Sequence, residues 1–370
     1  MRLDAIKTEN FRNIKGEIHW GRGLNILFGE NGHGKTNWLE AIYVLATARS
    51  FKTAKLQETI QFGEEMATIG GRVHQSEGIE RDLTATIVGN IKSFAVNGKR
   101  ETAQNYLGEV FAVLFNADEL SIVRGMPDQR RRFLDSGIVS LHPPFVQTYT
   151  DFGRVLRQKN KLLQTARDRE LSVQKAAELL SPWNEQLIGL AARIHKGRMR
   201  FVQRINEALE AKLFGREEIS IKYVSSLEGK GDLADYEALL AERLRLRVHA
   251  ELVAGYSLVG PQRDDMEIQF DGHDIRKYGS AGQQRSVLLQ LQLANISVFH
   301  MTHGEYPLFL LDDIDAELDY RRIGQLLEFL DGKTQTFVTT SKKSFVDDFG
   351  GSASVYNIEN GVAVSLAASA

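Results

Sequence analysis

Residues 28–38, "FGENGHGKTNW", carry the most informative motif of this chain. Within it, residues 29–36 match the pattern G-x-x-x-x-G-K-[ST], whose backbone N–H groups wrap the phosphates of a nucleotide. An apolar run, residues 24–27, precedes the pattern, and apolar residues at helical spacing follow it through residues 39–46. A strand before the glycines and a helix after them is the context in which this pattern binds phosphate, because the helix directs its N-terminus at the anion. The alternative is a glycine-rich turn with no ligand, and both flanks count against it.

A buried strand that ends in two carboxylates complements this phosphate cradle. In a nucleotide site Lys35 reaches the β- and γ-phosphates and the Thr36 hydroxyl binds Mg²⁺. The apolar run 308–311 leads directly into Asp312 and Asp313. The first acid is expected on the metal and the second beside the attacking water. Taken alone, two aspartates after a strand are equally well a turn cap.

A second helix start of the same character lies at residues 280–284, "SAGQQ", ahead of apolar residues at helical spacing. Small residues and a hydroxyl at a helix start form an anion site, since the N–H groups of the first turn have no partner inside the helix. An ordinary N-cap at Ser280 is the alternative for this stretch in isolation.

Composition narrows the class of protein. The 370 residues are 42% hydrophobic and 25% charged, as in an ordinary globular protein of two domains or one elaborated domain. No cysteine is present, which excludes disulfides and thiol catalysis. The N-terminus lacks the apolar core of a signal peptide and the chain lacks an apolar run of about 18 residues, so we expect a cytoplasmic protein with no membrane partner.

Charge is distributed unevenly along the chain. Residues 124–250 hold 23 Lys and Arg against 16 Asp and Glu, a balance of +7, whereas the rest of the chain has a balance of −9. A basic middle segment suits a polyanion-binding surface, and a solvated helical face is the competing interpretation.

The pattern of elements indicates an α/β body interrupted by a helical insertion. Residues 83–88 and 93–96 are predicted strands, and Asn97-Gly98 is typical of a tight hairpin turn. A helical period dominates residues 145–213, which we interpret as two antiparallel helices, the second opened by Ser181-Pro182. The β/α pattern then returns, with a terminal hairpin at Asn360-Gly361.

These motifs together carry a family resemblance. The ordered set of residues 29–36, 280–284, 308–313 and 316–319 resembles the Walker A, signature, Walker B and D-loop elements of ABC-type ATPase heads. More narrowly, "NFRN" at 10–13, "QRRRFLD" at 129–135 and "GPQRDD" at 260–265 resemble the RecF recombination-mediator family, over nearly the whole chain. The resemblance implies an α/β fold, namely an ABC-type P-loop ATPase head of residues 1–115 and 251–370 with an antiparallel β subdomain. An inserted, mainly helical lobe of residues 116–250 carries a short coiled-coil-like arm.

The resemblance also implies a function. Such heads are ATP-operated dimers, in which the nucleotide on one subunit is completed by the signature of the other. Proteins similar to RecF use this clamp on duplex DNA and at ssDNA–dsDNA junctions, and with RecR and RecO they help to load RecA at gaps in damaged DNA. ATP and Mg²⁺ are the implied ligands, with a weak, DNA-stimulated ATPase activity. The implied nucleotide-site residues are Arg12, Asn13, Gly29, Asn31, Gly32, Gly34, Lys35, Thr36, Asn37, Ser280, Gly282, Gln283, Asp312 and Asp313, of which Thr36 and Asp312 hold the metal and Lys35, Ser280, Asp312 and Asp313 carry catalysis.

Two departures from the ABC pattern modify these expectations. Many ABC heads end Walker B in Glu, whereas Asp313 is one methylene shorter, and a misplacement of about 1 Å can cost roughly 100-fold in rate. We therefore expect slow hydrolysis. The usual switch histidine is replaced by residues 339–341, "TTS", which makes Thr340 a candidate γ-phosphate sensor. An SMC-like structural head and a transport ATPase subunit are the alternative functions.

The DNA contacts are expected in the basic segment. This segment contains no major-groove recognition motif, so we expect contacts to the DNA backbone with little sequence readout. The candidate residues are Arg130, Arg131, Arg132, Arg154, Arg157, Lys159, Lys161, Lys196, Arg198 and Arg200.

Overall fold

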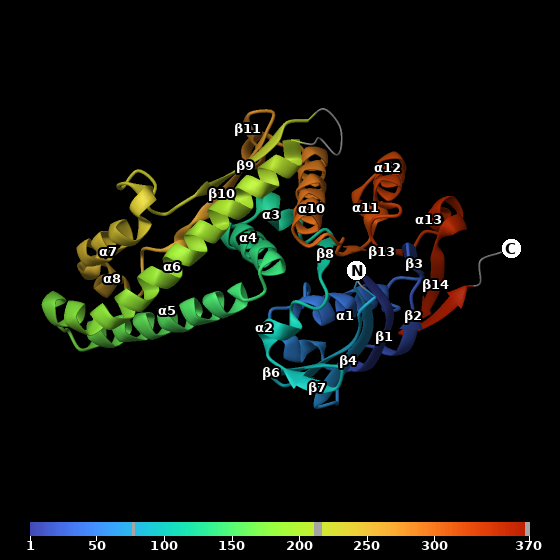
Figure 1. Cartoon of the computed structure of the whole chain (residues 1–370), viewed down its shortest axis with the longest axis horizontal. Helices are drawn as coiled ribbons and strands as arrows, with labels where there is room; N and C mark the ends of the chain where they lie inside the picture. The colour runs from blue at the N-terminus through green and yellow to red at the C-terminus, as the bar shows by residue number, and fades with distance from the viewer. Residues whose placement is uncertain (76–77, 211–216, 367–370) are drawn as a thin grey trace. The chain divides into compact units, whose positions relative to one another are not determined.

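The chain consists of two compact units (Figure 1). The computed structural model describes residues 1–75, 78–210 and 217–366. The first unit comprises residues 1–120 and 280–370, and the second comprises residues 121–279. The second predicted boundary, at residue 251, is therefore corrected to 280. Strand β10 (Asp265–Phe270) belongs with the inserted unit because it pairs along its length with β9 (Ile219–Val224).

An antiparallel sheet forms one layer of the first unit. Its six strands lie in the order β2-β1-β4-β5-β6-β7. Their bounds are β1 (Arg2–Phe11), β2 (Ile14–His19), β4 (Met66–His74), β5 (Glu80–Val88), β6 (Ile91–Val96) and β7 (Lys99–Glu101). Asn97 and Gly98 join β6 to β7 with φ angles of 51° and 75°. Positive φ at both central residues suits a tight hairpin, so this predicted turn is confirmed.

A mainly parallel sheet forms the second layer. Its order is β15-β14-β3-β13-β12-β8, and only β15 runs antiparallel to its neighbour. The strands are β3 (Leu24–Phe28), β8 (Ala112–Phe115), β12 (Leu308–Leu311), β13 (Thr336–Thr340), β14 (Ser354–Glu359) and β15 (Val362–Leu366). The predicted hairpin at Asn360-Gly361 joins the last two strands and is confirmed. Strand β13 lies between β3 and β12, so the ends of these three strands meet at one edge.

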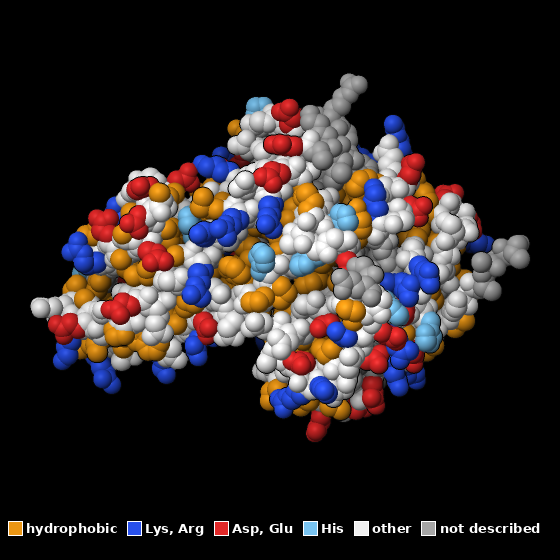
Figure 2. Space-filling view, viewed as in Figure 1, with side chains coloured by type: hydrophobic (Ala, Val, Ile, Leu, Met, Phe, Trp, Pro, Cys, Tyr) orange, Lys and Arg blue, Asp and Glu red, His pale blue; other side chains and the backbone are white. Residues whose placement is uncertain are grey.

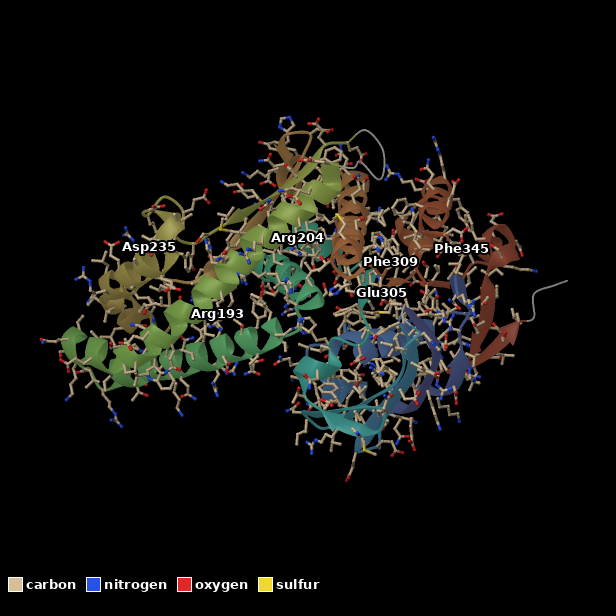
Figure 3. The ribbon with its side chains drawn as sticks, in the orientation of Figure 1. Arg193, Arg204, Asp235, Glu305, Phe309 and Phe345 are labelled. Carbon is tan, nitrogen blue, oxygen red and sulfur yellow. The ribbon has the colours of Figure 1, made fainter. Side chains whose placement is uncertain are left out.

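Helices complete the first unit. Helix α1 (Lys35–Thr47) contacts strands of both sheets, and its Trp38 and Leu39 are fully buried. Phe309 on β12 and Phe345 on α13 are likewise fully buried (Figure 3). The remaining helices are α2 (Ala103–Tyr106), α10 (Ala281–His303), α11 (Ile314–Glu317), α12 (Tyr320–Leu330) and α13 (Lys343–Phe349), while α3 (Leu120–Arg124) begins where the second unit starts. The predicted α/β class with an antiparallel β layer is confirmed.

The second unit is mainly helical. Two long helices, α5 (Phe145–Asp168) and α6 (Val173–Glu210), pack side by side in opposite directions, as predicted. Their shared core includes Phe152, Leu187 and Ile194. The other elements are α4 (Pro127–Leu141), α7 (Tyr236–Leu246), α8 (Val248–Ala254), α9 (Ile275–Tyr278) and β11 (His273–Asp274), the last paired with β10.

The predicted start of the second long helix is wrong. Pro182 lies inside α6, which begins nine residues earlier, at Val173. Proline inside a helix costs about 3 kcal/mol through its missing N–H and its ring. The segment ahead of it nevertheless stays helical because it buries Ala176 and Leu180 against α5 and α8. Packing of this apolar face offsets the local penalty.

Candidate functional site

The loop between β3 and α1 has the backbone that a phosphate cradle needs. Gly29, Gly32 and Gly34 have φ angles of 153°, 84° and 103°. A Cβ at Gly29 would lie 2.4 Å from the carbonyl oxygen of Ile358, so no larger residue fits there. Helix α1 begins at Lys35 with no side-chain cap, which leaves the N–H groups of its first turn without a side-chain acceptor. These observations fit an anion at the helix N-terminus.

Lys35 lies on the inner side of this loop. Its side chain is buried, and its Nζ donates to the carbonyl oxygens of Gly29 at 2.9 Å and Glu30 at 2.8 Å. Burial lowers the pKa of Lys35, and the nearby carboxylates of Asp313, Asp312 and Asp315 act in the opposite direction. The loop's own carbonyl oxygens therefore hold the ammonium on the inner side of the loop.

The cradle and the Walker B strand meet through Thr36 and Asp312. The Thr36 hydroxyl donates to Oδ1 of Asp312 at 2.9 Å. Two neighbouring ligands of an octahedral Mg²⁺, each at about 2.1 Å, lie about 3 Å apart, so this hydroxyl and carboxylate fit the predicted metal. Burial raises the pKa of Asp312 and that of Asp313. Both carboxylates therefore lie where burial disfavours their charged form, and a bound cation would offset this.

Thr339, the residue before the candidate γ-phosphate sensor Thr340, contacts these carboxylates. Its hydroxyl donates to Oδ1 of Asp312 at 2.7 Å and accepts the backbone N–H of Asp313 at 2.8 Å. The Thr340 hydroxyl instead accepts the N–H of Lys342 at 3.0 Å. Successive residues of a strand point to opposite faces, and this alternation explains why only one of the pair lies at the Walker B aspartates.

The N-terminal motif, residues 10–13, contacts α1. Arg12 forms a bidentate ion pair with the buried Glu40, at 2.9 and 2.8 Å, and its Nη1 donates to the carbonyl oxygen of Glu58. Its guanidinium is thus paired within the protein. Asn13 lies closer to the cradle, because its Oδ1 accepts from Asn37 Nδ2 at 2.6 Å and its Nδ2 donates to Gly32 O at 3.4 Å.

Lys52 joins the site although the sequence pattern did not single it out. Its Nζ donates to Oδ1 of Asn37 at 2.7 Å. Desolvation lowers the pKa of Lys52, and the attraction of Glu40, Asp312 and Asp313 opposes this. Lys52 follows α1 in a loop that matches no motif, so only the folded chain reveals a second ammonium beside the carboxylates.

The signature segment begins α10. Ser280 Oγ accepts the N–H of Gln283 at 3.3 Å and Gln283 Oε1 accepts the N–H of Ser280 at 2.8 Å, a capping box. The N-cap interpretation is therefore observed within one chain. Ser280, Ala281 and Gly282 are nevertheless exposed, so the start of this 23-residue helix is open to a ligand or a second molecule.

Three of the predicted DNA contacts are buried ion pairs, and these assignments are corrected. Arg130 pairs with Asp265 at 2.6 Å, Lys159 with Glu251 at 2.8 Å, and Arg198 with Asp135 at 2.9 Å. Their side chains are 0%, 0% and 4% exposed. A buried charge is retained only when it is paired, and these cations hold α4, α5, α6, α8 and β10 together.

The other predicted cations remain accessible to different degrees. Arg131 is partly buried and donates to the carbonyl oxygen of Asp264 at 2.8 Å. Arg132 and Arg154 are 65% and 67% exposed and lie near Asp128 and Asp151 on their own helices. The remaining predicted cations, Arg157, Lys161, Lys196 and Arg200, are exposed on the two long helices.

Helix α6 carries a continuous row of exposed cations, which we call the α6 stripe. It consists of Arg193, Lys196, Arg200 and Arg204, at spacings of three or four residues that keep them on one helical face. Figure 3 labels its two ends, and Figure 2 shows Lys and Arg side chains gathered over this helix. Sequence reasoning missed Arg193 and Arg204, although the same helical spacing could have found them.

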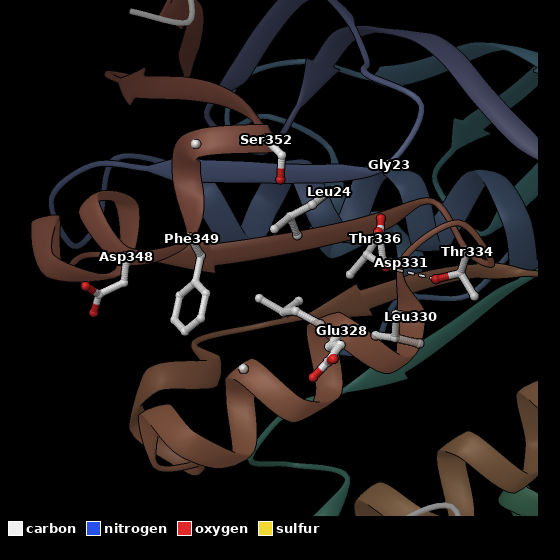
Figure 4. Close-up of a pocket in the computed structure, with 13 residues that line it drawn as sticks. Gly23, Leu24, Glu328, Leu330, Asp331, Thr334, Thr336, Asp348, Phe349 and Ser352 are labelled. Carbon is white, nitrogen blue, oxygen red and sulfur yellow. Dashed lines mark hydrogen bonds between the residues drawn. The ribbon is translucent and has the colours of Figure 1, made fainter.

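A cavity of about 350 Å³ lies elsewhere in the first unit (Figure 4). It is lined by Leu24, Thr336 and residues of α12 and α13. Leu24 and Thr336 begin their strands, whereas the cradle follows the opposite end of β3. The cavity is therefore separate from the cradle.

Within the ranges that the structure describes, no helix is long and apolar enough to cross a membrane.

Comparison with known proteins identifies the family. The family described as "RecF/RecN/SMC N terminal domain" matches residues 2–364. The DNA replication and repair protein RecF of Shouchella clausii is 33% identical over 357 residues, 94% of this chain and 95% of that protein. The protein of the same description from Listeria welshimeri is 35% identical over 373 residues, 98% and 99% of the two chains.

Solved structures agree with this assignment. The structure of the recombination mediator protein RecF-ATPrS in the RecFOR pathway has a TM-score of 0.90 at 29% identity and covers 99% of this chain and 98% of its own. The corresponding RecF-ATP structure has a TM-score of 0.90 at 30% identity, covering 99% and 97%. An SMC head bound to the C-winged helix domain of ScpA, with a TM-score of 0.55 at 16% identity, shares the fold alone. The chain belongs to the RecF family of DNA replication and repair proteins.

Proposed function

We propose that this protein is an ATP-dependent, dimerising DNA-binding protein of recombinational repair that hydrolyses ATP slowly. The observation that carries the proposal is the joining of the phosphate cradle to the Walker B carboxylate, Thr36 to Asp312 at 2.9 Å, in a chain of the RecF family. Close relatives solved with ATP and ATPrS support ATP as the nucleotide.

Each residue of the site has a role in this proposal. The loop N–H groups and Lys35 bind the phosphates, and Lys52 adds positive charge beside Asn37. Thr36 and Asp312 hold Mg²⁺, which neutralises charge that develops on the phosphates when it is bound. Asp313 orients the attacking water. Its short side chain makes hydrolysis slow, so that ATP acts as a timer for the bound state.

The dimer follows from the exposed start of α10. Ser280 and Gly282 are open to solvent, and the N–H groups of the first turn attract the γ-phosphate bound by a second chain. A γ-phosphate contacted from two chains links them, whereas ADP leaves the second surface without a partner. ATP therefore closes the dimer and hydrolysis opens it.

DNA is bound through phosphates by the α6 stripe with the accessible cations of α5. The stripe covers 11 residue steps, about 16 Å at 1.5 Å per residue, long enough for several backbone contacts. Arg130, Lys159 and Arg198 are not part of this surface. Duplex DNA and ssDNA–dsDNA junctions are the proposed substrates, with RecR and RecO as partners in loading RecA, in keeping with relatives placed in the RecFOR pathway.

Size-exclusion chromatography tests this function. The chain is applied with ATP and Mg²⁺, with ADP and Mg²⁺, and with ATP and a duplex that carries a single-stranded gap. The proposal requires a dimer with ATP but not with ADP, and it requires this dimer to retain the DNA. A monomer under all three conditions, or DNA binding that does not depend on nucleotide, would overturn it. Lys35→Met is expected to lose both properties.

A further inference from the structure

We propose that Thr339 is a positioning residue for ATP hydrolysis, because its hydroxyl holds the metal-binding Asp312 and the water-orienting Asp313 in one fixed arrangement. This inference rests on the proposed ATPase function and names a residue beyond the Walker motifs.

Thr339 occupies the strand between the two halves of the site. Strand β13 pairs with β3, which leads into the cradle, and with β12, which ends at Asp312. The Thr339 side chain is 0% exposed and lies near the carboxyl end of this strand. Thr339 therefore lies in the sheet between the strand that leads into the cradle and the strand that ends at Asp312.

The hydroxyl makes two bonds whose directions are fixed. A threonine hydroxyl has one proton and can accept as well. Its proton goes to Asp312 Oδ1 at 2.7 Å, and its oxygen accepts the N–H of Asp313 at 2.8 Å. Thr36 donates to the same Oδ1 at 2.9 Å. Two hydroxyls from separate elements thus hold one carboxylate oxygen, which fixes the rotation of the carboxylate at the metal position.

The second bond supports an unusual backbone. Asp313 has a φ of 48°, in the left-handed region that residues other than glycine rarely adopt. Such a conformation persists only where the surroundings hold it. The bond from the Asp313 N–H to Thr339 fixes this peptide, and the peptide in turn sets the direction in which the Asp313 side chain leaves the chain.

A matched set of variants tests this role. Thr339→Val keeps the shape but removes the hydroxyl, and Thr339→Ser restores a hydroxyl. Thr336→Val is the control, because Thr336 is also buried on β13 and its hydroxyl bonds to that of Thr334, at 2.8 Å, at the other end of the strand. Three quantities are measured for each variant: kcat for ATP, Kd for a fluorescent ADP, and the Mg²⁺ concentration that half-saturates the Mg²⁺-dependent part of ADP binding.

Loss of an outer hydrogen bond to a metal-binding group typically costs about 10-fold to 100-fold in activity or metal affinity. Thr339→Val should lower kcat by this factor and raise the half-saturating Mg²⁺ concentration, with the metal-free Kd for ADP unchanged because the cradle is intact. Thr339→Ser should recover most of the kcat, and Thr336→Val should match the wild type.

Two results overturn the inference: a Thr339→Val protein with wild-type kcat and Mg²⁺ dependence, or a Thr339→Ser protein as impaired as Thr339→Val, which would indicate a packing role. A wild-type chain without ATPase activity would defeat the proposed function instead. In that case the Mg²⁺ dependence of ADP binding still decides whether Thr339 positions Asp312.

Discussion

Arg198 and Arg200 lie two residues apart on α6, but the same substitution should affect stability at Arg198 and DNA binding at Arg200. Arg198 is 4% exposed and bonds both carboxylate oxygens of Asp135, at 2.9 and 3.0 Å, together with the carbonyl oxygen of Pro261 at 2.7 Å. Arg200 is exposed and belongs to the α6 stripe. Replacing each with Gln therefore separates folding from DNA binding.

The magnitudes follow from these surroundings. Arg198→Gln leaves Asp135 without its partner, and breaking a buried pair costs about 3 to 5 kcal/mol. In a unit of this size, that loss lowers Tm by roughly 10 °C. Arg200→Gln should leave Tm unchanged but remove one phosphate contact, which reduces the slope of log K against log salt by about 0.9 and weakens duplex binding about 5-fold at 0.15 M salt.

Thermal melts and fluorescence-anisotropy titrations at four salt concentrations measure both effects. The ATP-bound protein is used throughout, and Lys196→Gln serves as a second member of the stripe with the same expected loss of slope. These assignments are wrong if Arg200→Gln leaves the salt slope unaltered, or if Arg198→Gln lowers the salt slope while Tm is unaffected.

Three further substitutions test the nucleotide site. Gly29→Ala should abolish binding of a fluorescent ATP analogue, because its Cβ would lie 2.4 Å from the Ile358 carbonyl oxygen, and wild-type affinity would contradict the assigned loop geometry. Asp312→Asn should stop hydrolysis and raise Tm at pH 7. Burial raises the pKa of Asp312, so the contribution of this carboxyl to folding is favourable below its ordinary pKa of 3.8 and is lost as pH rises through the folded pKa. At pH 7 the uncharged Asn therefore has the advantage. The Tm difference between Asp312→Asn and the wild type should shrink in acid. A variant with a lower Tm than the wild type at pH 7 would exclude a raised pKa for Asp312. Arg12→Ala should destabilise the protein by about 3 to 5 kcal/mol in urea unfolding, because Glu40, which is 0% exposed, loses its ion-pair partner and keeps the Ser50 hydroxyl. A neutral result would show that the remaining hydrogen bonds satisfy Glu40.

The parts of the fold that depend on local rules were predictable from the sequence. The cradle needs glycine at Gly29 and Gly34, and a buried strand must lead into Asp312, so pattern and chemistry coincide there. The hairpin at Asn97-Gly98 follows equally from its backbone requirement. The helical unit was visible from its period, but its boundary was not, because the pairing of β10 with β9 joins segments that are distant along the chain.

The exposure of charged groups could not be predicted in this way. Arg130 and Arg132 are neighbours in one arginine run, yet one is buried against Asp265 and the other is exposed. Which arginine turns inward depends on a carboxylate supplied by a distant strand. The same reason hid Lys52 and Thr339, which carry no motif and acquire a role only from what the fold places beside them.

In the proposed dimer, the start of α10 in one chain completes the nucleotide site of the other. The chain contains no cysteine, so single cysteines can report this contact without background. Chains with Glu30→Cys, an 89% exposed side chain next to the cradle, are mixed with chains carrying Ala281→Cys and treated with a short bis-maleimide. A covalent heterodimer is expected with a non-hydrolysable ATP analogue and Mg²⁺, and none with ADP or after Ser280→Arg is added to the second chain. Crosslinking that is equal with ADP and the ATP analogue, or absent from a mixture saturated with the ATP analogue, would contradict this arrangement.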